Sequence, residues 1–98
     1  MTQANDSQRV HIVVQGRVQN VGFRAHVQYN ARQIGVTGWV RNVGYDTVEA
    51  VGEGEQEKLE RFVVVVKAGP LGSQVDEAQV EWLPATGEYH DFQLRRSM

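Results

Sequence analysis

The sequence predicts an α+β domain in which two helices cover one face of an antiparallel sheet. Three observations lead to this fold class. The chain has 98 residues, which is enough for one domain and no more. Its composition, 41% hydrophobic and 22% charged residues, is typical of a globular protein. Segments with strand-like alternation and segments with helix-like spacing follow one another in the order β-α-β-β-α-β.

The first part of the chain predicts a strand, a loop and a helix. Residues 9–15 carry β-branched side chains at alternate positions, which is typical of a strand. Residues 16–22 begin and end with glycine and predict a loop. From Phe23 to Ile34 apolar residues recur at helical spacing, and Gly35 supplies a C-terminal stop for the helix.

The middle of the chain predicts two strands that pair as a hairpin. Residues 36–43 form the first strand and residues 47–51 the second, joined through Gly44-Tyr45-Asp46. We expect Gly52-Glu53-Gly54 to break the second strand, because glycine weakens strand interiors.

The last part predicts a second helix, a fourth strand and a short terminal strand. Leu59, Phe62 and Val66 form a helical stripe that ends before Gly69-Pro70. The run of four valines at residues 63–66 favours a strand locally, but the flanking apolar spacing favours a helix. Residues 73–82 alternate again, and the final strand holds the apolar residues Tyr89, Phe92 and Leu94.

This order of elements is the ferredoxin-like plan, a split βαβ arrangement with both helices on one face of the sheet. The expected domain spans residues 9–95, with a short extra C-terminal strand. Residues 1–8 are expected to form a flexible N-terminal tail and residues 96–98 a C-terminal tail.

Composition excludes several classes of function. The chain has no cysteine, which excludes disulfides, thiolate metal sites and a cysteine nucleophile. It has no apolar run near 18 residues and no hydrophobic leader, so we expect a cytoplasmic monomer that does not enter a membrane. Its three histidines lack metal-ligand spacing, so no metal is assigned. The net charge of −2 and the lack of an RNP-like aromatic pair disfavour nucleic acid as a partner.

Charge is spread unevenly along the chain. Residues 7–45 contain five arginines and no acid, whereas residues 46–98 contain eleven acids and five basic residues. This asymmetry suggests an anionic ligand bound by the first half, or a chance run of charges that the fold mixes.

The position of Arg24 is a more specific indication of an anionic ligand. It lies in the first turn of the predicted helix, where a cation is unfavourable by about 0.3–1 kcal/mol unless an anion lies beside it. A bound phosphate would supply that anion. The alternative is an arginine that points into water.

The loop before Arg24 has the character of a phosphate-binding segment. A loop between a strand and a helix, flanked by glycines, directs main-chain amides at an anion. Its glycines have five residues between them and no Lys-Ser/Thr follows, so it is not a Walker A loop. Position 18 is Val where a cysteine phosphatase would need its Cys nucleophile. The loop is therefore suited to hold a phosphate without attacking it.

Two segments together resemble the signature of the acylphosphatase family. They are Gly16 to Arg24 and Gly38-Trp39-Val40-Arg41-Asn42, within a likeness that covers roughly residues 9–95. Members also occur as the N-terminal domain of a large hydrogenase-maturation protein. Because no second domain follows here, the resemblance is to the small free-standing enzyme.

The resemblance implies hydrolysis of carboxyl-phosphate mixed anhydrides to a carboxylate and inorganic phosphate, without a metal, cofactor or phosphoenzyme. It implies that Arg24 holds the phosphate and that Asn42 orients the attacking water. Main-chain amides of the phosphate-binding loop assist Arg24. The residues of that loop are Arg17, Val18, Gln19, Asn20, Val21, Gly22 and Phe23. The alternative is a non-catalytic phosphate-binding module of the same fold, with turnover weakened by Asn20.

The chain departs from the family pattern at three places. Asn20 stands where the family usually has glycine, inside the phosphate-binding loop. Either Asn20 adopts the left-handed backbone that glycine allows and tunes the loop, or it caps the following helix or sits in an ordinary turn. Tyr45-Asp46 replaces the usual Asp-Gly of the turn, and Val64 and Val65 occupy helix positions that are usually polar or larger.

Overall fold

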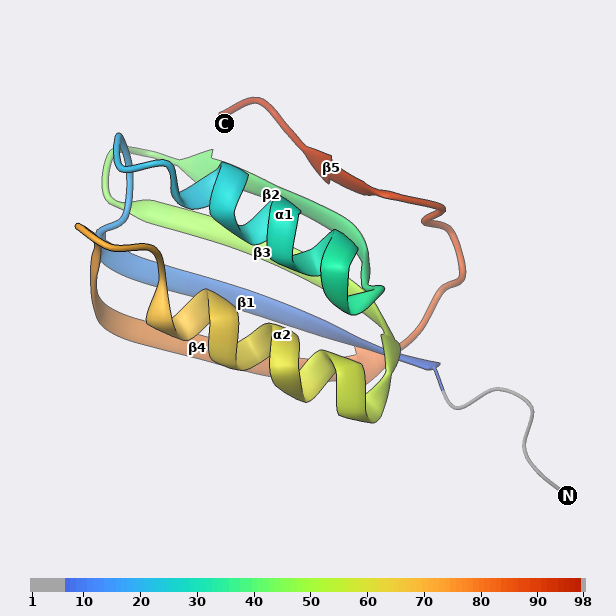
Figure 1. The fold of residues 1–98 in the computed structure, drawn as a ribbon. Helices are drawn as coiled ribbons and strands as arrows, with labels where there is room; N and C mark the ends of the chain where they lie inside the picture. The colour runs from blue at the N-terminus through green and yellow to red at the C-terminus, as the bar shows by residue number, and fades with distance from the viewer. Residues whose placement is uncertain (1–6, 98) are drawn as a thin grey trace, which may run out of the picture.

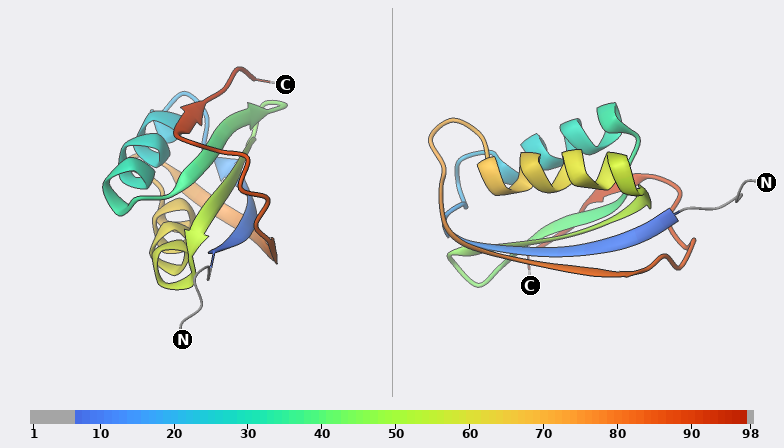
Figure 2. Two further views of the ribbon diagram at one scale, coloured as in Figure 1. Left: turned by 90° about the vertical axis from the view of Figure 1, so that its right-hand side faces the viewer. Right: turned by 90° about the horizontal axis from the view of Figure 1, so that it is seen from below.

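The computed structural model describes residues 7–97 of the chain. Its elements are β1 (Ser7–Arg17), α1 (Phe23–Ile34), β2 (Thr37–Val43), β3 (Thr47–Glu55), α2 (Gln56–Ala68), β4 (Gln74–Pro84) and β5 (Phe92–Leu94). Both helices lie side by side on one face of a single sheet (Figures 1 and 2). The predicted ferredoxin-like α+β fold is therefore confirmed, with its short terminal strand.

The sheet has the strand order β4-β1-β3-β2-β5. The pairs β1–β4, β1–β3 and β2–β3 are antiparallel, whereas β5 pairs parallel to β2 at the edge. β1 begins at Ser7, two residues before the expected start, because Ser7 pairs with Glu55. The rest of the predicted N-terminal tail lies outside the described residues.

The hydrophobic core lies between the helices and the sheet. Alternate residues of β1, including Val10 and Ile12, are fully buried on the face that meets the helices. Phe62 of α2 is also fully buried and makes an edge-on ring contact with Phe92 of β5, at 5.6 Å between centroids. This contact anchors the short terminal strand to the core. No helix in residues 7–97 has the length and apolar character that crossing a bilayer requires.

The expected break at Gly52-Glu53-Gly54 is wrong, because β3 runs unbroken through these residues to Glu55. A Cβ at Gly52 would lie 2.8 Å from side-chain atoms of both Phe62 and Val36. Gly52 therefore marks a place where α2 packs closely on the sheet, and the strand pairing continues beneath it. α2 begins immediately after the strand, at Gln56, and the valine run is helical as predicted.

Helix α1 has the predicted limits. It begins at Phe23 and ends at Ile34, and Gly35 adopts a left-handed backbone with φ 98° while its amide donates to the carbonyl of Ala31. The preceding loop is shorter than expected, because β1 extends through Gly16 and Arg17 after an irregularity in its pairing with β4. The loop and the start of α1 therefore lie at the end of the sheet where β2 and β3 meet in a turn (Figure 1).

Candidate functional site

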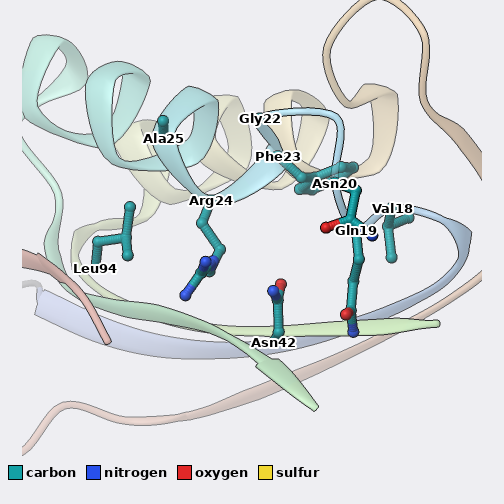
Figure 3. Close-up of a pocket in the computed structure, with 9 residues that line it drawn as sticks. All are labelled: Val18, Gln19, Asn20, Gly22, Phe23, Arg24, Ala25, Asn42 and Leu94. Atoms are coloured by element: carbon teal, nitrogen blue, oxygen red, sulfur yellow. The ribbon is translucent and has the colours of Figure 1, made fainter. Parts of the chain in front are cut away.

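A pocket of about 180 Å³ opens between the start of α1 and the sheet (Figure 3). It brings together Arg24 and Asn42, which are 18 positions apart in the sequence. The lining residues are Val18, Gln19, Asn20, Gly22, Phe23, Arg24, Ala25, Asn42 and Leu94. Five of the seven predicted loop residues are among them, whereas Arg17 and Val21 are not.

The phosphate-binding loop is anchored at both ends and in its middle. Val18 is fully buried and Phe23 is 2% exposed, so their side chains fix the loop to the core. The side-chain amide of Gln19 donates to the carbonyls of Gly44 at 3.2 Å and of Thr47 at 2.9 Å. These bonds tie the loop to the turn between β2 and β3, which ends the strand that carries Asn42.

The main-chain amides of the loop are free to receive an anion. Within residues 7–97, no amide from Val18 to Ala25 donates to another residue, and the first such bond runs from His26 to the carbonyl of Gly22 at 3.0 Å. Gly22 is the N-cap of α1, has φ 76°, and leaves the helix without a side-chain cap. Unpaired amides at a helix N-terminus favour a bound anion.

Asn20 adopts the left-handed backbone, with φ 64°, and is the one described residue other than glycine with positive φ. It does not cap α1, because Gly22 occupies the cap position. The structure thus excludes the helix cap and shows the left-handed backbone, whereas the effect of residue 20 on the loop stays a prediction.

Arg24 lies in the first turn of α1, and its half-buried side chain extends toward β2 (Figure 3). Its Nη1 donates to the main-chain carbonyl of Arg95 at 3.0 Å. No acid lies in the first turn of α1, and within residues 7–97 no carboxylate forms an ion pair with Arg24. Among the described residues, the guanidinium of Arg24 thus has no carboxylate as a counterion.

Asn42 points from β2 into the same space as Arg24 (Figure 3). It lies opposite Val48 in the pairing of β2 with β3, on the sheet face that meets the helices. Its side-chain amide has no hydrogen-bond partner among residues 7–97. Both the donor and the acceptor of this amide are therefore available to a ligand or a water.

Carboxylates near the pocket are engaged elsewhere. Asp46, in the turn beside Gln19, accepts from the side chains of Gln15 at 2.9 Å and Thr47 at 3.0 Å. These two hydrogen bonds, the first above all, hold the pKa of Asp46 below its usual value. No Asp, Glu or His lines the pocket, and across residues 7–97 no three such side chains gather as a metal-binding group. The site therefore offers binding and orientation without a strong base.

Sequence reasoning missed four contributors to the site. Leu94 and Ala25 line the pocket, and the side chain of Gln19 anchors the loop for which only its main chain was predicted. Arg95 contributes a main-chain carbonyl, a group that every residue carries and that has no sequence signal. Pairing of β5 with β2 brings Leu94 and Arg95 to the pocket, and this pairing was not foreseen.

Comparison with known proteins gives consistent matches. The family model described as acylphosphatase matches residues 10–94. An acylphosphatase of Pelotomaculum thermopropionicum is 44% identical over 86 residues, covering 88% of this chain and 94% of the relative. The acylphosphatase structure from Bacillus subtilis superimposes with a TM-score of 0.85 at 36% identity, over 90% of this chain and 98% of that one. The structure of an acylphosphatase from Coxiella burnetii superimposes with a TM-score of 0.88 at 32% identity, over 97% of this chain and 100% of that one.

Proposed function

The chain belongs to the acylphosphatase family, and on this premise we propose how its residues divide the hydrolysis of an acyl phosphate between them. Arg24 and the free amides of the phosphate-binding loop hold the phosphoryl group, and Asn42 orients the attacking water. The observation that carries the proposal is the meeting, in one pocket, of an arginine without a counterion, unpaired amides and an unpartnered amide side chain.

The reaction exchanges one oxygen at phosphorus for another. The water oxygen forms a bond to phosphorus, the bond from phosphorus to the acyl oxygen breaks, and the carboxylate leaves with the electron pair. An acyl phosphate already carries a good leaving group, so positioning and charge stabilisation are the main tasks left to the protein.

Each group of the pocket has a distinct task in this scheme. The guanidinium of Arg24 and the amides neutralise the phosphoryl oxygens as charge shifts toward the carboxylate. Asn42 accepts a hydrogen bond from the water through its carbonyl oxygen or donates one to the water oxygen through its NH₂ group, which fixes the direction of attack. Because no protein base lines the pocket, a phosphoryl oxygen of the substrate takes the proton that the water loses.

The test separates binding from turnover. Hydrolysis of benzoyl phosphate is measured with EDTA present, and binding of inorganic phosphate is measured independently by NMR titration. Arg24→Gln should weaken phosphate binding about 10- to 150-fold, the range for loss of a charge-assisted contact, and lose turnover as well. Asn42→Ala should bind phosphate nearly as well as the unaltered chain but lose turnover about 100-fold or more, because it only positions the water.

Each contrary result has a distinct meaning. Near-normal hydrolysis by Arg24→Gln would remove Arg24 from the mechanism. Equal losses of binding and rate in Asn42→Ala would show that Asn42 holds the phosphate rather than the water. Phosphate binding without turnover in the unaltered chain would favour a non-catalytic phosphate-binding module.

A further inference from the structure

We propose that Arg95 is a positioning residue for Arg24: its main-chain carbonyl, held in place by stacking of its own side chain on Trp39, orders the Arg24 guanidinium for phosphate. The inference rests on the proposed role of Arg24 and adds a second residue that acts through it.

The contact to Arg24 comes from the main chain just beyond β5. The carbonyl oxygen of Arg95 accepts from Arg24 Nη1 at 3.0 Å, and the amide of Arg95 donates to the carbonyl of Val40 at 2.8 Å. A guanidinium has five N–H donors, so one bond to a carbonyl leaves the others for phosphoryl oxygens. Ordering a long side chain before the ligand arrives lowers the entropy cost of binding.

The edge strand that supplies this carbonyl needs support. β5 has only three residues, and Arg95 follows it in an exposed segment. The guanidinium carbon of Arg95 lies 5.0 Å from the centre of the Trp39 ring, within the range of a cation–π contact. This stack fixes the end of β5 against β2.

Trp39 is itself a rigid support. It is 8% exposed, and its indole Nε1 donates to the hydroxyl of Tyr89 at 3.1 Å. The guanidinium carbon of Arg41 lies 4.8 Å from the ring centre, and Arg41 is bound through Nη2 to Glu49 at 2.7 Å. The ring on which Arg95 rests is therefore held by two further contacts.

The side chain of Arg95 lies on the sheet face opposite the pocket. Trp39 precedes Val40, which is fully buried beneath the helices, so Trp39 faces the other way. Arg95 stacks on Trp39 and is absent from the pocket lining. It therefore acts on the site through its main chain and has no direct reach to the phosphate.

The experiment compares Arg95→Ala with Arg96→Ala. Both remove one positive charge from adjacent exposed positions, and the side chain of Arg96 has no partner among residues 7–97. Binding of inorganic phosphate is followed by NMR titration, and KM and kcat are measured with benzoyl phosphate. Arg95→Ala should weaken phosphate binding about three- to tenfold relative to Arg96→Ala, the scale of one hydrogen bond. KM should rise by a similar factor with little change in kcat, because the lost contact serves ground state and transition state alike.

Two further variants identify the route of the effect. Arg95→Lys keeps a cation over Trp39 and should recover part of the affinity. In the Arg24→Gln background Arg95→Ala should have no further effect on phosphate binding, because the group that it positions is gone.

The outcomes separate this inference from the function on which it rests. If Arg24→Gln binds phosphate normally, the proposed role of Arg24 fails. If Arg24→Gln binds weakly while Arg95→Ala matches Arg96→Ala, only the positioning role is wrong. A loss that persists in the Arg24→Gln background, or tighter binding by Arg95→Ala, would also overturn the positioning role.

Discussion

Asn20 places a left-handed backbone in the middle of the phosphate-binding loop. For a residue with a Cβ this conformation costs roughly 1–2 kcal/mol, and Asn tolerates it better than most residues. The amides on either side of Asn20 are unpaired within residues 7–97, so their direction depends on the backbone angles at this residue. The identity of residue 20 should therefore tune phosphate affinity without altering the fold.

Asn20→Gly tests this at the residue scale. Glycine removes the cost of positive φ, of order 1 kcal/mol, which corresponds to up to about fivefold tighter binding of phosphate. Asn20→Ala is the matched control and should bind more weakly than the unaltered chain, because alanine resists positive φ more than asparagine does. Phosphate titrations of the three proteins check the order Gly, Asn, Ala. Equal phosphate affinities of the three proteins would show that the direction of the loop amides does not depend on residue 20.

At the scale of helices and strands, a glycine can mark a place of close packing rather than the end of an element. At Gly35 it ends α1, as expected, because the backbone is left-handed there. At Gly52 the same residue type lies within β3, where Phe62 leaves no room for a Cβ. The two roles look alike in the sequence, and only the helix packed above the strand distinguishes them.

Helix α2 exposes an apolar side chain, Val64, that takes no part in the buried core. Val64 is 67% exposed, whereas Val66 is 1% exposed. Val64→Glu should keep phosphatase activity and reduce aggregation on heating, because it interrupts a β-prone apolar run with a charge. Arg61 and Lys67 lie three residues to either side and favour a glutamate there.

Light scattering during a thermal ramp, with activity assayed before heating, checks the prediction for Val64→Glu. Val66→Glu is the buried control and should lose the fold, because an unpaired charge would enter the core. A large loss of stability in Val64→Glu would mean that the side chain takes part in packing.

At the scale of the whole molecule, Glu53 links the sheet to the segment that carries β5. Glu53 is 5% exposed, and its carboxylate accepts from the amides of Thr86 at 2.9 Å and Gly87 at 3.0 Å. Burial raises the pKa of Glu53, but these bonds, the Thr86 hydroxyl and the charge of Arg9 outweigh it, so the pKa lies below its ordinary value. The ionised form therefore stabilises the fold.

The pH dependence follows from the direction of this shift. The unfolded chain, with a glutamate pKa of about 4.3, takes up the proton first as the pH falls. The stabilisation by Glu53 is thus complete well above that value and is lost as the pH falls through the lower pKa of the folded state. Glu53→Gln should lower the free energy of unfolding by about 1–3 kcal/mol at pH 7, because the NH₂ group of the new glutamine faces amide donors. Near pH 3 the loss should be smaller.

Urea denaturation at several pH values measures this difference. Glu88→Gln is the control, since Glu88 is half exposed and contacts Arg9 at 3.3 Å at the surface. It should change stability by less than about 1 kcal/mol. A Glu53→Gln difference that stays constant from pH 7 to pH 3 would show that ionisation of Glu53 contributes nothing.

The sequence by itself indicated the order of elements, the limits of α1 and two residues, Arg24 and Asn42, that meet in the pocket. Periodicity and the terminal glycine are local signals, so α1 could be predicted from Phe23 to Ile34. The absence of acids on either side of Arg24 in the chain is likewise visible in the sequence, and within residues 7–97 no carboxylate forms an ion pair with Arg24. The positive φ of Asn20 was one of two local interpretations and needed the structure to decide it.

Only the tertiary structure decided how the distant parts meet. The unbroken course of β3, the parallel pairing of β5 with β2 and the bond from Arg24 to the carbonyl of Arg95 each join residues far apart in the chain. Such contacts depend on which surfaces the packed core brings together, and a main-chain carbonyl is the same at every residue. The residue types therefore indicate the chemistry of the pocket, while the packing of the edge strand decides how Arg24 is held there.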